Sequence, residues 1–556
     1  MNVEEVQRRL WEQSGTHREH AASSTPLFPT NPHDMRVRNL MDLMHNPQWL
    51  REAADRVLKR SYNKAPGVDG VTTRAFRKGL DGKLENLRLE LKRGTYQPQP
   101  LRRVMIPKAN GKMRALGIPC LRDKIVQEAM RMALEPIFEI EFHKHSYGFR
   151  PNRSTHHAVF RCQQLMRHGF TWVIEGDVKA CFDEISHKAI LKVVREKVQD
   201  NKFLDLLRRF LKAGVQIDDV VQPTEKGVPQ GGVISPLLAN AVLNKLDWYL
   251  HKQGHHGNAR QRAYHAGRSD VRFVRYADDW CVFITRGTKR KAEILREQIR
   301  GFLLGECGLE LSVEKTHVTH VRDGFDFLGF RLIQETGRNG KRVPKILVGP
   351  KAVRNLKTRL DEAIRLRPQQ ESVALRLQRG SAVVRGWSEY YRIAHNFPRM
   401  AGTLDHHAFW IAVKALCRKF DITTAQCVKK YGSRGVIRLD ESCELERFSG
   451  KSMKLDYRGP DPYEPGKPVY EHDLDMEADF ARYNERKRLG NLDLKLRTLQ
   501  RDQYRCRQCG SSVTDQDSQL DHIEPVACFA TFGAASTDDN LQTLCLNCHW
   551  LKHYAI

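Results

Sequence analysis

The residues best suited to chemistry are two adjacent carboxylates, Asp278 and Asp279, within the stretch Phe273–Val282. They follow Tyr276-Ala277 and stand between two apolar runs. A short apolar–acidic–apolar pattern predicts a β-hairpin with the acids at its tip. Because neighbouring carboxylates repel each other, a positive partner should lie beside them, and Mg²⁺ is the natural candidate for hard oxygen ligands. An ordinary acidic turn is the alternative for this pair alone.

A third carboxylate, Asp177, follows the apolar run Trp172–Ile174, which we expect to form a strand that ends just before the acid. Nucleotidyl transfer with two metal ions needs carboxylates from separate segments, because one cation activates the attacking 3′-hydroxyl and the other stabilises the leaving pyrophosphate. Phe182, further along, is a candidate to pack under a sugar and exclude a 2′-hydroxyl. An ordinary core phenylalanine is the alternative.

A loop rich in glycine and proline, Gly227–Pro236, precedes a helical pattern over residues 237–246. Such residue types favour tight turns, which let a side chain such as Gln230 approach a base pair or a sugar closely. A loop of this kind is weak evidence alone, so its interpretation depends on the motifs on either side of it.

The charge of the chain limits its partners. Its 556 residues include 93 Lys and Arg against 66 Asp and Glu, a formal net charge of +27. This excess predicts a polyanion, RNA or DNA, although a basic solvated surface is the alternative. No apolar run is long enough to span a bilayer and no signal peptide is evident, so we expect a cytoplasmic protein of the bacterial cytosol or nucleoid, without a membrane partner. The 13 cysteines, mostly single, agree with a reducing compartment.

Four cysteines near the C-terminus are paired as Cys506-x-x-Cys509 and Cys545-x-x-Cys548. In a reducing compartment, two such pairs predict a structural, tetrahedral Zn²⁺ site. Polar motifs lie between and after these pairs, at Leu520–Pro525, Asp539–Leu544 and His549–His553. This arrangement resembles the HNH endonucleases.

The resemblance to HNH endonucleases implies a ββα-metal fold with one divalent cation, Mg²⁺ or Mn²⁺, although imidazole ligands would also accept Zn²⁺ or Ni²⁺. His522 would activate water, and Asp521, on the other face of the strand, would bind the metal. His549 and His553, four residues apart, would share one helical face and complete the site. Asn540 would orient His522 or brace the metal loop. A frayed tail is the alternative for His553.

Ordered motifs over about half of the chain resemble the reverse transcriptases encoded by group II introns. They are Lys64–Thr72, Arg103–Pro119, Ser146–Ser154, the Asp177 and Pro229–Gly231 segments, Tyr276–Asp279, Leu311–Thr316 and Phe327–Phe330. The resemblance implies a right-hand polymerase fold with fingers, palm and thumb. Asp177 and Asp278 would bind two Mg²⁺ ions, with Asp279 as the third acid, and the substrates would be dNTPs.

Further roles follow from the same resemblance. Lys108 and Arg114 flank a polar turn in the fingers, where positive charge would hold the triphosphate, and Lys112 remains an alternative. Lys315 would lie near the pyrophosphate, although an ordinary surface lysine is nearly as good an interpretation. Tyr276 would lie under the primer terminus.

The region after the palm is expected to be helical over residues 350–420, with an apolar face and a basic face. Within it, Arg385–Arg392 resembles the maturase signature of group II intron proteins. The resemblance implies a thumb that binds intron RNA, and we expect Arg385 and Arg392 to face RNA. We expect Trp387 to be buried.

The sequence therefore predicts a multidomain α+β protein. Its expected parts are an N-terminal extension (1–60), fingers and palm (61–335), a thumb and maturase domain (336–420), a DNA-binding region and linker assigned by position (421–490), and an HNH domain (491–556). The expected protein copies RNA into DNA, assists splicing of its intron RNA and cuts the second strand of target DNA during retrohoming. A splicing-only maturase, another retroelement reverse transcriptase or a stand-alone endonuclease are the alternatives.

Overall fold

The computed structural model divides the chain into two compact units. The first contains the described residues up to Leu328 together with Gln334–Pro344, and the second contains Gly329–Ile333 and the described chain from Lys345 onward. The structure describes residues 2–22, 37–61, 64–107, 113–217, 220–222, 224–228, 231–337, 340–367, 371–433, 435–440, 443–449, 495–514, 518–523, 538–545 and 548.

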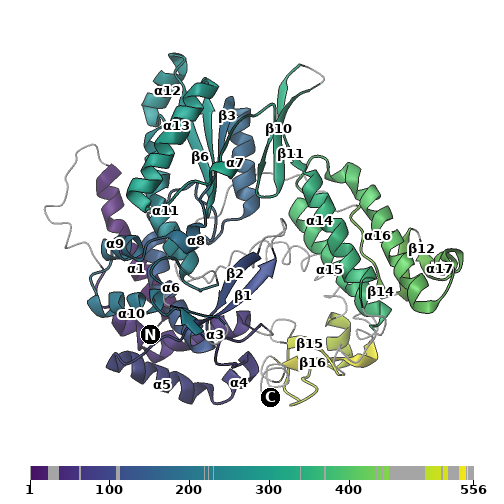
Figure 1. Cartoon of the computed structure of the whole chain (residues 1–556). Coiled ribbons are helices and arrows are strands. Elements are labelled where there is room, and N and C mark those ends of the chain that lie inside the picture. The colour runs from purple at the N-terminus through teal and green to yellow at the C-terminus, as the bar shows by residue number, and fades with distance from the viewer. Residues whose placement is uncertain are drawn as a thin grey trace. The chain divides into compact units, whose positions relative to one another are not determined.

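A four-stranded antiparallel sheet lies in the upper part of the first unit as drawn in Figure 1, with the strand order β6-β7-β3-β8. Successive side chains of strand β3 point to opposite faces of the sheet, so Val173 and Ile174 pack on different faces. Both sides are covered, which explains why these strands read as nearly continuous apolar runs. The strands are β3 (Phe170–Asp177), β6 (Asp270–Tyr276), β7 (Asp279–Thr285) and β8 (His317–His320).

Helices cover both faces of this sheet (Figure 1). Helix α7 (Thr155–Arg167) lies on one face, and helices α11 (Ser235–Lys252) and α13 (Lys289–Phe302) lie on the other. Ile174 of β3 belongs to the large core that also contains Leu246 of α11 and Ile299 of α13. This packing fixes the ends of the strands on which the acidic residues stand.

A second sheet of the first unit has the order β2-β1-β4-β5 and contains the antiparallel pair β1–β2. The helices near the N-terminus pack mainly through α3 and α6, and the Trp49 indole donates a hydrogen bond to the Ala129 carbonyl at 3.1 Å. The strands are β1 (Leu101–Pro107), β2 (Met113–Ile118), β4 (Val215–Ile217) and β5 (Val220–Gln222). The remaining helices are α1 (Val3–Ala22), α2 (Leu40–Met44), α3 (Pro47–Arg60), α4 (Thr73–Arg77), α5 (Leu80–Arg93), α6 (Leu121–Glu139), α8 (Cys181–Glu184), α9 (His187–Arg195), α10 (Asn201–Leu211) and α12 (Gly257–His265).

Strands β9 (Phe325–Phe327), β10 (Phe330–Thr336) and β11 (Arg342–Val348) form a three-stranded sheet in the order β11-β10-β9. The helical region that follows contains α14 (Pro350–Leu360), which continues into a π-helical turn over Asp361–Arg365. Its buried residues Leu356, Leu360 and Ile364 recur every four positions, as expected for one helical face.

Two long helices, α15 (Val373–Tyr391) and α16 (Phe397–Phe420), complete this helical part of the second unit. Residues beyond 420 pack onto them: the Phe448 amide donates to Asp405 at 2.6 Å, and Ser381 Oγ accepts from the Glu446 amide at 3.1 Å. The described part of 421–449 is therefore integral to this helical body. Its elements are α17 (Thr424–Tyr431), β12 (Gly432–Ser433), β13 (Val436–Asp440) and β14 (Cys443–Glu444).

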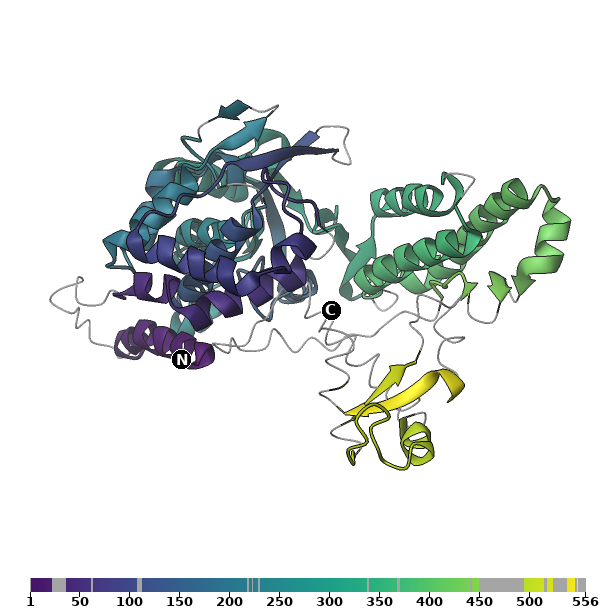
Figure 2. The ribbon, with the colours of Figure 1, turned by 90° about the horizontal axis from the view of Figure 1, so that it is seen from below.

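The C-terminal region contains a hairpin formed by β15 (Ser518–His522) and β16 (Leu541–Cys545), preceded by helical residues 495–501 (Figure 2). A small core of Leu499, Val513 and Leu544 joins the helix to the hairpin beside Cys506 and Cys548. Among the described helices, none combines the length and apolar character needed to cross a bilayer.

Candidate polymerase and nuclease sites

The predicted acidic hairpin is confirmed. Strands β6 and β7 pair antiparallel with Tyr276 opposite Asp279, so Ala277 and Asp278 form the turn between them. Asp279 is also opposite Asp177, the last residue of the neighbouring strand β3. The sheet register therefore brings together the three carboxylates that the sequence singled out. One detail differs, because strand β3 includes Asp177 instead of ending before it.

The electrostatics of these acids indicate a shortage of positive charge. Desolvation and repulsion from Asp278 and Asp177 raise the pKa of Asp279 to about 7. Desolvation also raises the pKa of Asp278, against the positive charges of Arg114 and Lys315. Asp279 is nonetheless open to solvent on one side, where a ligand can reach it.

Lys315 is the basic side chain in direct contact with these acids among the described residues. Its Nζ lies 2.7 Å from Asp177 Oδ2. The segment that carries Lys315 is fixed to the end of β3, because the Ser312 amide donates to the Asp177 carbonyl at 2.9 Å. One lysine cannot neutralise three carboxylates, so the site has the donor set and the charge deficit that suit divalent cations.

Magnesium fits this site by donor chemistry, since carboxylate oxygens are the ligands that it prefers. Asp177, Asp278 and Asp279 would hold the cations, which supply activation of a 3′-hydroxyl and charge neutralisation of a leaving pyrophosphate. In the described part of the chain, the carboxylate oxygens of these three acids do not all lie within 4.8 Å of one another. The ligand atoms of the four cysteines described below do.

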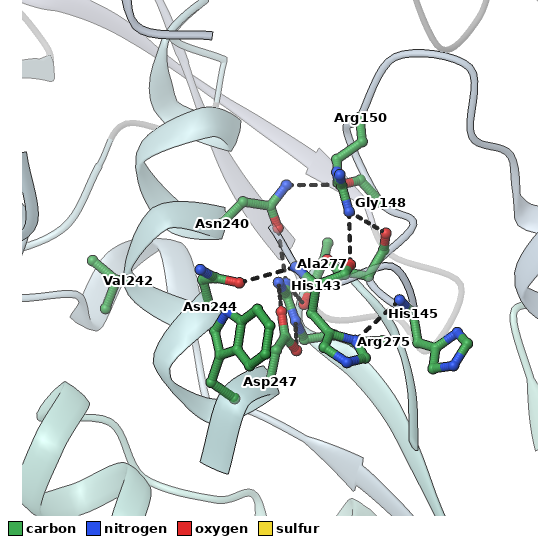
Figure 3. Close-up of polar contacts among 12 residues, drawn as sticks. His143, His145, Gly148, Arg150, Asn240, Val242, Asn244, Asp247, Arg275 and Ala277 are labelled. Atoms are coloured by element: carbon green, nitrogen blue, oxygen red, sulfur yellow. Dashed lines mark hydrogen bonds and ion pairs between the residues drawn. The ribbon is translucent and has the colours of Figure 1, made fainter. Parts of the chain in front are cut away.

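The buried guanidinium of Arg275 supports the turn that contains Ala277 and Asp278 (Figure 3). Arg275 Nη1 donates to the Ala277 carbonyl at 2.9 Å and to Asn240 Oδ1 at 2.8 Å. Its Nε and Nη2 atoms donate to the two carboxylate oxygens of Asp247 at 2.7 and 2.6 Å. Ala277 has a φ of 56°, a left-handed conformation that an alanine rarely adopts. Arg275 therefore acts as a positioning residue for Asp278.

Two glycines allow close packing around the turn. The Gly148 carbonyl accepts from Asn240 Nδ2 at 2.7 Å, and a Cβ atom at Gly148 would lie 2.3 Å from the Ala277 amide nitrogen. On β3, a Cβ atom at Gly176 would lie 2.1 Å from the Trp280 ring. Larger side chains at either position would displace the strands that carry the acids.

The other predicted nucleotide contacts are only partly described. Phe182 is half-buried, and its ring meets the ring of Phe149 edge-on at 6.2 Å. Arg114 lies on β2 and is exposed, and its charge acts on Asp278. Tyr276 is half-buried at the end of β6. The predicted contacts Lys108 and Gln230, together with the alternative Lys112, lie outside the described residues.

The maturase-like helix α15 carries an aromatic cluster. The ring of Trp387 lies 4.6 Å from Tyr391 and 5.6 Å from Phe448, and Trp387 is half-buried instead of fully buried as expected. Arg385 keeps 61% of its side chain exposed and pairs with Glu446. Arg392 keeps only 15% exposed, because it packs inward and pairs with Glu389 at 2.8 Å.

The four predicted cysteines converge. Ligand atoms of Cys506, Cys509, Cys545 and Cys548 all lie within 4.8 Å of one another, the one such group found among the described residues. Hydrogen bonds from Ser511 lower the pKa of Cys509 to about 6, which favours the thiolate that a metal binds. Thiolates at this spacing fit a tetrahedral Zn²⁺ site.

Two of the predicted nuclease residues, Asp521 and Asn540, are described on or next to the hairpin beside the cysteines. Asp521 is buried and accepts from Gln542 Nε2 at 2.8 Å. Asn540 is buried, and its carbonyl accepts from the Ile523 amide at 2.8 Å, just after His522 at the end of β15. The side chain of His522 lies outside the described part of the structure, as do His549 and His553 entirely.

Three families of known proteins match separate parts of the chain. Residues 106–332 match the reverse transcriptases (RNA-dependent DNA polymerase), residues 353–432 match the group II intron maturase-specific domain, and residues 506–555 match the HNH endonucleases. The protein YkfC of Escherichia coli K12 is 46% identical over 56% of this chain and 87% of YkfC. The group II intron-encoded protein LtrA of Lactococcus lactis is 33% identical over 52% of this chain and 56% of LtrA. The chain belongs to the group II intron-encoded proteins.

This group II intron-encoded protein combines reverse transcriptase, maturase and HNH endonuclease domains in one chain. A further relative, the putative COX1/OXI3 intron 2 protein of Saccharomyces cerevisiae, is 29% identical over 71% of this chain and 53% of that protein. The chain thus spans about half the length of LtrA and of the yeast protein. The reverse transcriptase match agrees with the expected right-hand fold, and the matched residues 106–332 include the whole sheet that carries the acids.

Sequence reasoning missed the residues that support the acidic turn of this intron-encoded protein. Asn240 and Asp247 come from helix α11 and Gly148 comes from a loop, so nothing local links them to Asp278. One signal was present: Arg275 is a charged residue inside the otherwise mainly apolar approach to Tyr276. A buried charge of this kind needs a paired partner.

Proposed function

We propose that this protein copies RNA into DNA at Asp177, Asp278 and Asp279. The observation that carries the proposal is the register of strands β3, β7 and β6. It places Asp177 at the end of β3 opposite Asp279 at the start of β7, beside the turn that contains Asp278. The raised pKa of Asp279 supports it, because clustered acids that lack a counter-charge are ready to bind Mg²⁺.

Each side chain around the proposed polymerase site has a role that follows from its position. Arg275 and Asn240 hold the turn, and Lys315 keeps a positive charge at Asp177, where a pyrophosphate group would leave. Phe182 and Phe149 offer an aromatic surface for a sugar or base. Arg114 would contribute positive charge to triphosphate binding.

We further propose that the maturase domain binds the intron RNA and assists its splicing, with exposed Arg385 as a contact. The ribonucleoprotein would insert the RNA into one strand of the target DNA. The HNH domain would cut the other strand at a divalent cation held by Asp521, His549 and His553, with His522 as base and Asn540 as its support. Zn²⁺ at the four cysteines would hold this domain together. These events would take place in the bacterial cytosol.

Separation of activities tests the proposal. Asp278→Asn should abolish extension of an oligo(dT) primer on poly(rA) with Mg²⁺ while splicing of the copurifying intron RNA continues. The exposed acid Glu297 of α13 supplies a control, since Glu297→Gln should leave both unchanged. Extension by the Asp278→Asn protein would disprove the assigned site, and parallel loss of splicing would show that the acid is structural.

The nuclease is tested in the same way. His522→Ala should prevent cleavage of double-stranded DNA that contains the insertion site of the copurifying intron, with primer extension intact. Normal cleavage would disprove the assigned base. A copurifying pool of unrelated RNAs would disprove the intron-specific role.

A further inference from the structure

Helices α9 and α10 of the first unit carry a basic surface that the polymerase site does not use. Both helices bury an apolar face in the core, including Ile190 and Val194 of α9 and Phe203 and Leu207 of α10. Their other faces carry the charges. Lys188, Lys192 and Lys212 lie outside this apolar packing and are exposed.

The basic faces border a hollow of about 720 Å³. A second hollow of about 360 Å³ adjoins the first, since Arg208 and Lys212 line both. We call the two hollows together the α9–α10 groove. Its lining residues in the first hollow are His187, Lys188, Leu191, Lys192, Arg195, Glu196, Arg208 and Lys212.

The groove has a strong excess of positive charge. Lys188, Lys192 and Lys212 are exposed, and none of them takes part in the ion pairs found among the described residues. The acids nearby are few: Glu196 lines the groove, and Asp205 pairs with Arg208. Aliphatic lysine stems and Leu191 make the walls largely apolar, which suits the sugars and bases beside a phosphate chain.

Helix stability explains only part of this arrangement. Basic residues at helix C-terminal ends, here Lys192 and Arg195 of α9 and Arg208 and Lys212 of α10, interact favourably with the helix dipole. Lys188 lies in the first turn of α9, where the same dipole disfavours a cation. Lys188 and Lys192 are also four residues apart on one face, where like charges repel. A polyanionic ligand removes both disadvantages.

We propose that the α9–α10 groove is a second RNA-binding site, which holds a phosphate backbone outside the polymerase site. No residue lining the groove belongs to the acidic site around Asp177. Lysines four residues apart rise about 6 Å along a helix, which allows them to contact separate phosphates. The choice of RNA over DNA rests on the proposed function, because the maturase domain implies an RNA partner.

Salt-dependent binding tests the groove directly. The full chain with Lys188→Gln, Lys192→Gln and Lys212→Gln is compared with the wild type on a fluorescent 30-nucleotide single-stranded RNA and on DNA of the same sequence. Loss of three phosphate contacts should reduce the steepness of the plot of log association constant against log salt concentration by about 2. It should also weaken RNA binding about 10- to 100-fold near 0.1 M salt. A matched variant neutralises three exposed cations elsewhere on this unit, Lys252, Lys289 and Arg290. This control should change neither quantity.

The possible results distinguish failure of the groove proposal from failure of the polymerase proposal. Weaker RNA binding by the groove variant, with its melting temperature unchanged and the control variant normal, supports the groove. Unchanged RNA binding, equal losses in both variants or a loss confined to DNA overturns it. Primer extension by the wild-type preparation is measured alongside: if extension is absent, the polymerase proposal fails, and if extension is present without a binding effect, only the groove fails.

Discussion

Asp247 and Arg275 form an ion pair in which both side chains are fully buried, with 2.6 Å between Arg275 Nη2 and Asp247 Oδ2. The same guanidinium donates to the carbonyl of Ala277, one residue before Asp278. The position of Asp278, the carboxylate proposed for catalysis, therefore depends on an ion pair in the protein interior. Buried pairs contribute little net stability, but breaking one leaves a charge without a partner.

Arg275→Lys should lower the turnover number for primer extension about 100-fold with a smaller change in KM for dNTPs. Lysine keeps the charge but lacks the planar fork that contacts Asp247, Asn240 and the Ala277 carbonyl at once. Steady-state kinetics on poly(rA)/oligo(dT) measure the effect.

The control for this substitution lies on the same strand. Arg272 pairs with Asp270 at 2.8 Å in a similarly buried setting, at the end of β6 away from the turn. Arg272→Lys should lower thermal stability and leave the turnover number nearly unchanged. Equal losses of turnover in both variants would mean that Arg275 acts only on stability.

Gly148→Ala should impair extension, because the new Cβ atom would lie 2.3 Å from the Ala277 nitrogen and push the turn away. Gly301→Ala is the matched control, since Gly301 lies in helix α13 with open space around its Cβ position. The control should stabilise the helix by about 0.5–1 kcal/mol. Thermal melting and extension assays separate the two effects, and full activity of Gly148→Ala would contradict the packing argument.

Magnesium affinity should rise with pH through about 7, because protons and cations compete for Asp279. The sign follows from linkage: the folded state holds a proton on Asp279 that the unfolded chain loses near pH 4. Without divalent cations, this residue therefore lowers stability as pH rises from about 4 to 7. Melting temperatures with EDTA and with Mg²⁺ should diverge across that interval. Asp279→Asn should reduce the divergence, and an unchanged divergence would exclude Asp279 as the titrating group.

Removal of zinc should unfold the C-terminal hairpin but leave extension active. Cys506 and Cys548 belong to the small core with Leu499 and Leu544, so the loss of the ligands also disrupts packing. Cys506→Ser should release one equivalent of zinc, measured by elemental analysis of the full chain. Cys443→Ser, at a buried cysteine outside the cluster, should retain the zinc. Equal zinc contents in the two variants would refute the four-cysteine site.

Local patterns made several parts of the two sites predictable. The acidic hairpin around Asp278 depends on two apolar runs and the two-residue turn between them, all of which are neighbours in sequence. The cysteine pairs are equally local, since the spacing within each pair already suits one metal ion. Asp177 was singled out by the apolar run before it, and the family motifs supported it, although its distance in sequence from the hairpin hides its proximity in space.

The sequence by itself supplied the predicted chemistry of this protein: three acids proposed for cations, four cysteines proposed for zinc and a basic chain proposed for nucleic acid. Only the tertiary structure decided how the acids are held. Pairing of β3 with β7 set Asp177 opposite Asp279, and packing of helix α11 brought Asn240 and Asp247 to Arg275. It also left Trp387 half-buried and turned Arg392 inward. Such relationships depend on the packing of distant segments, for which a linear pattern carries no signal.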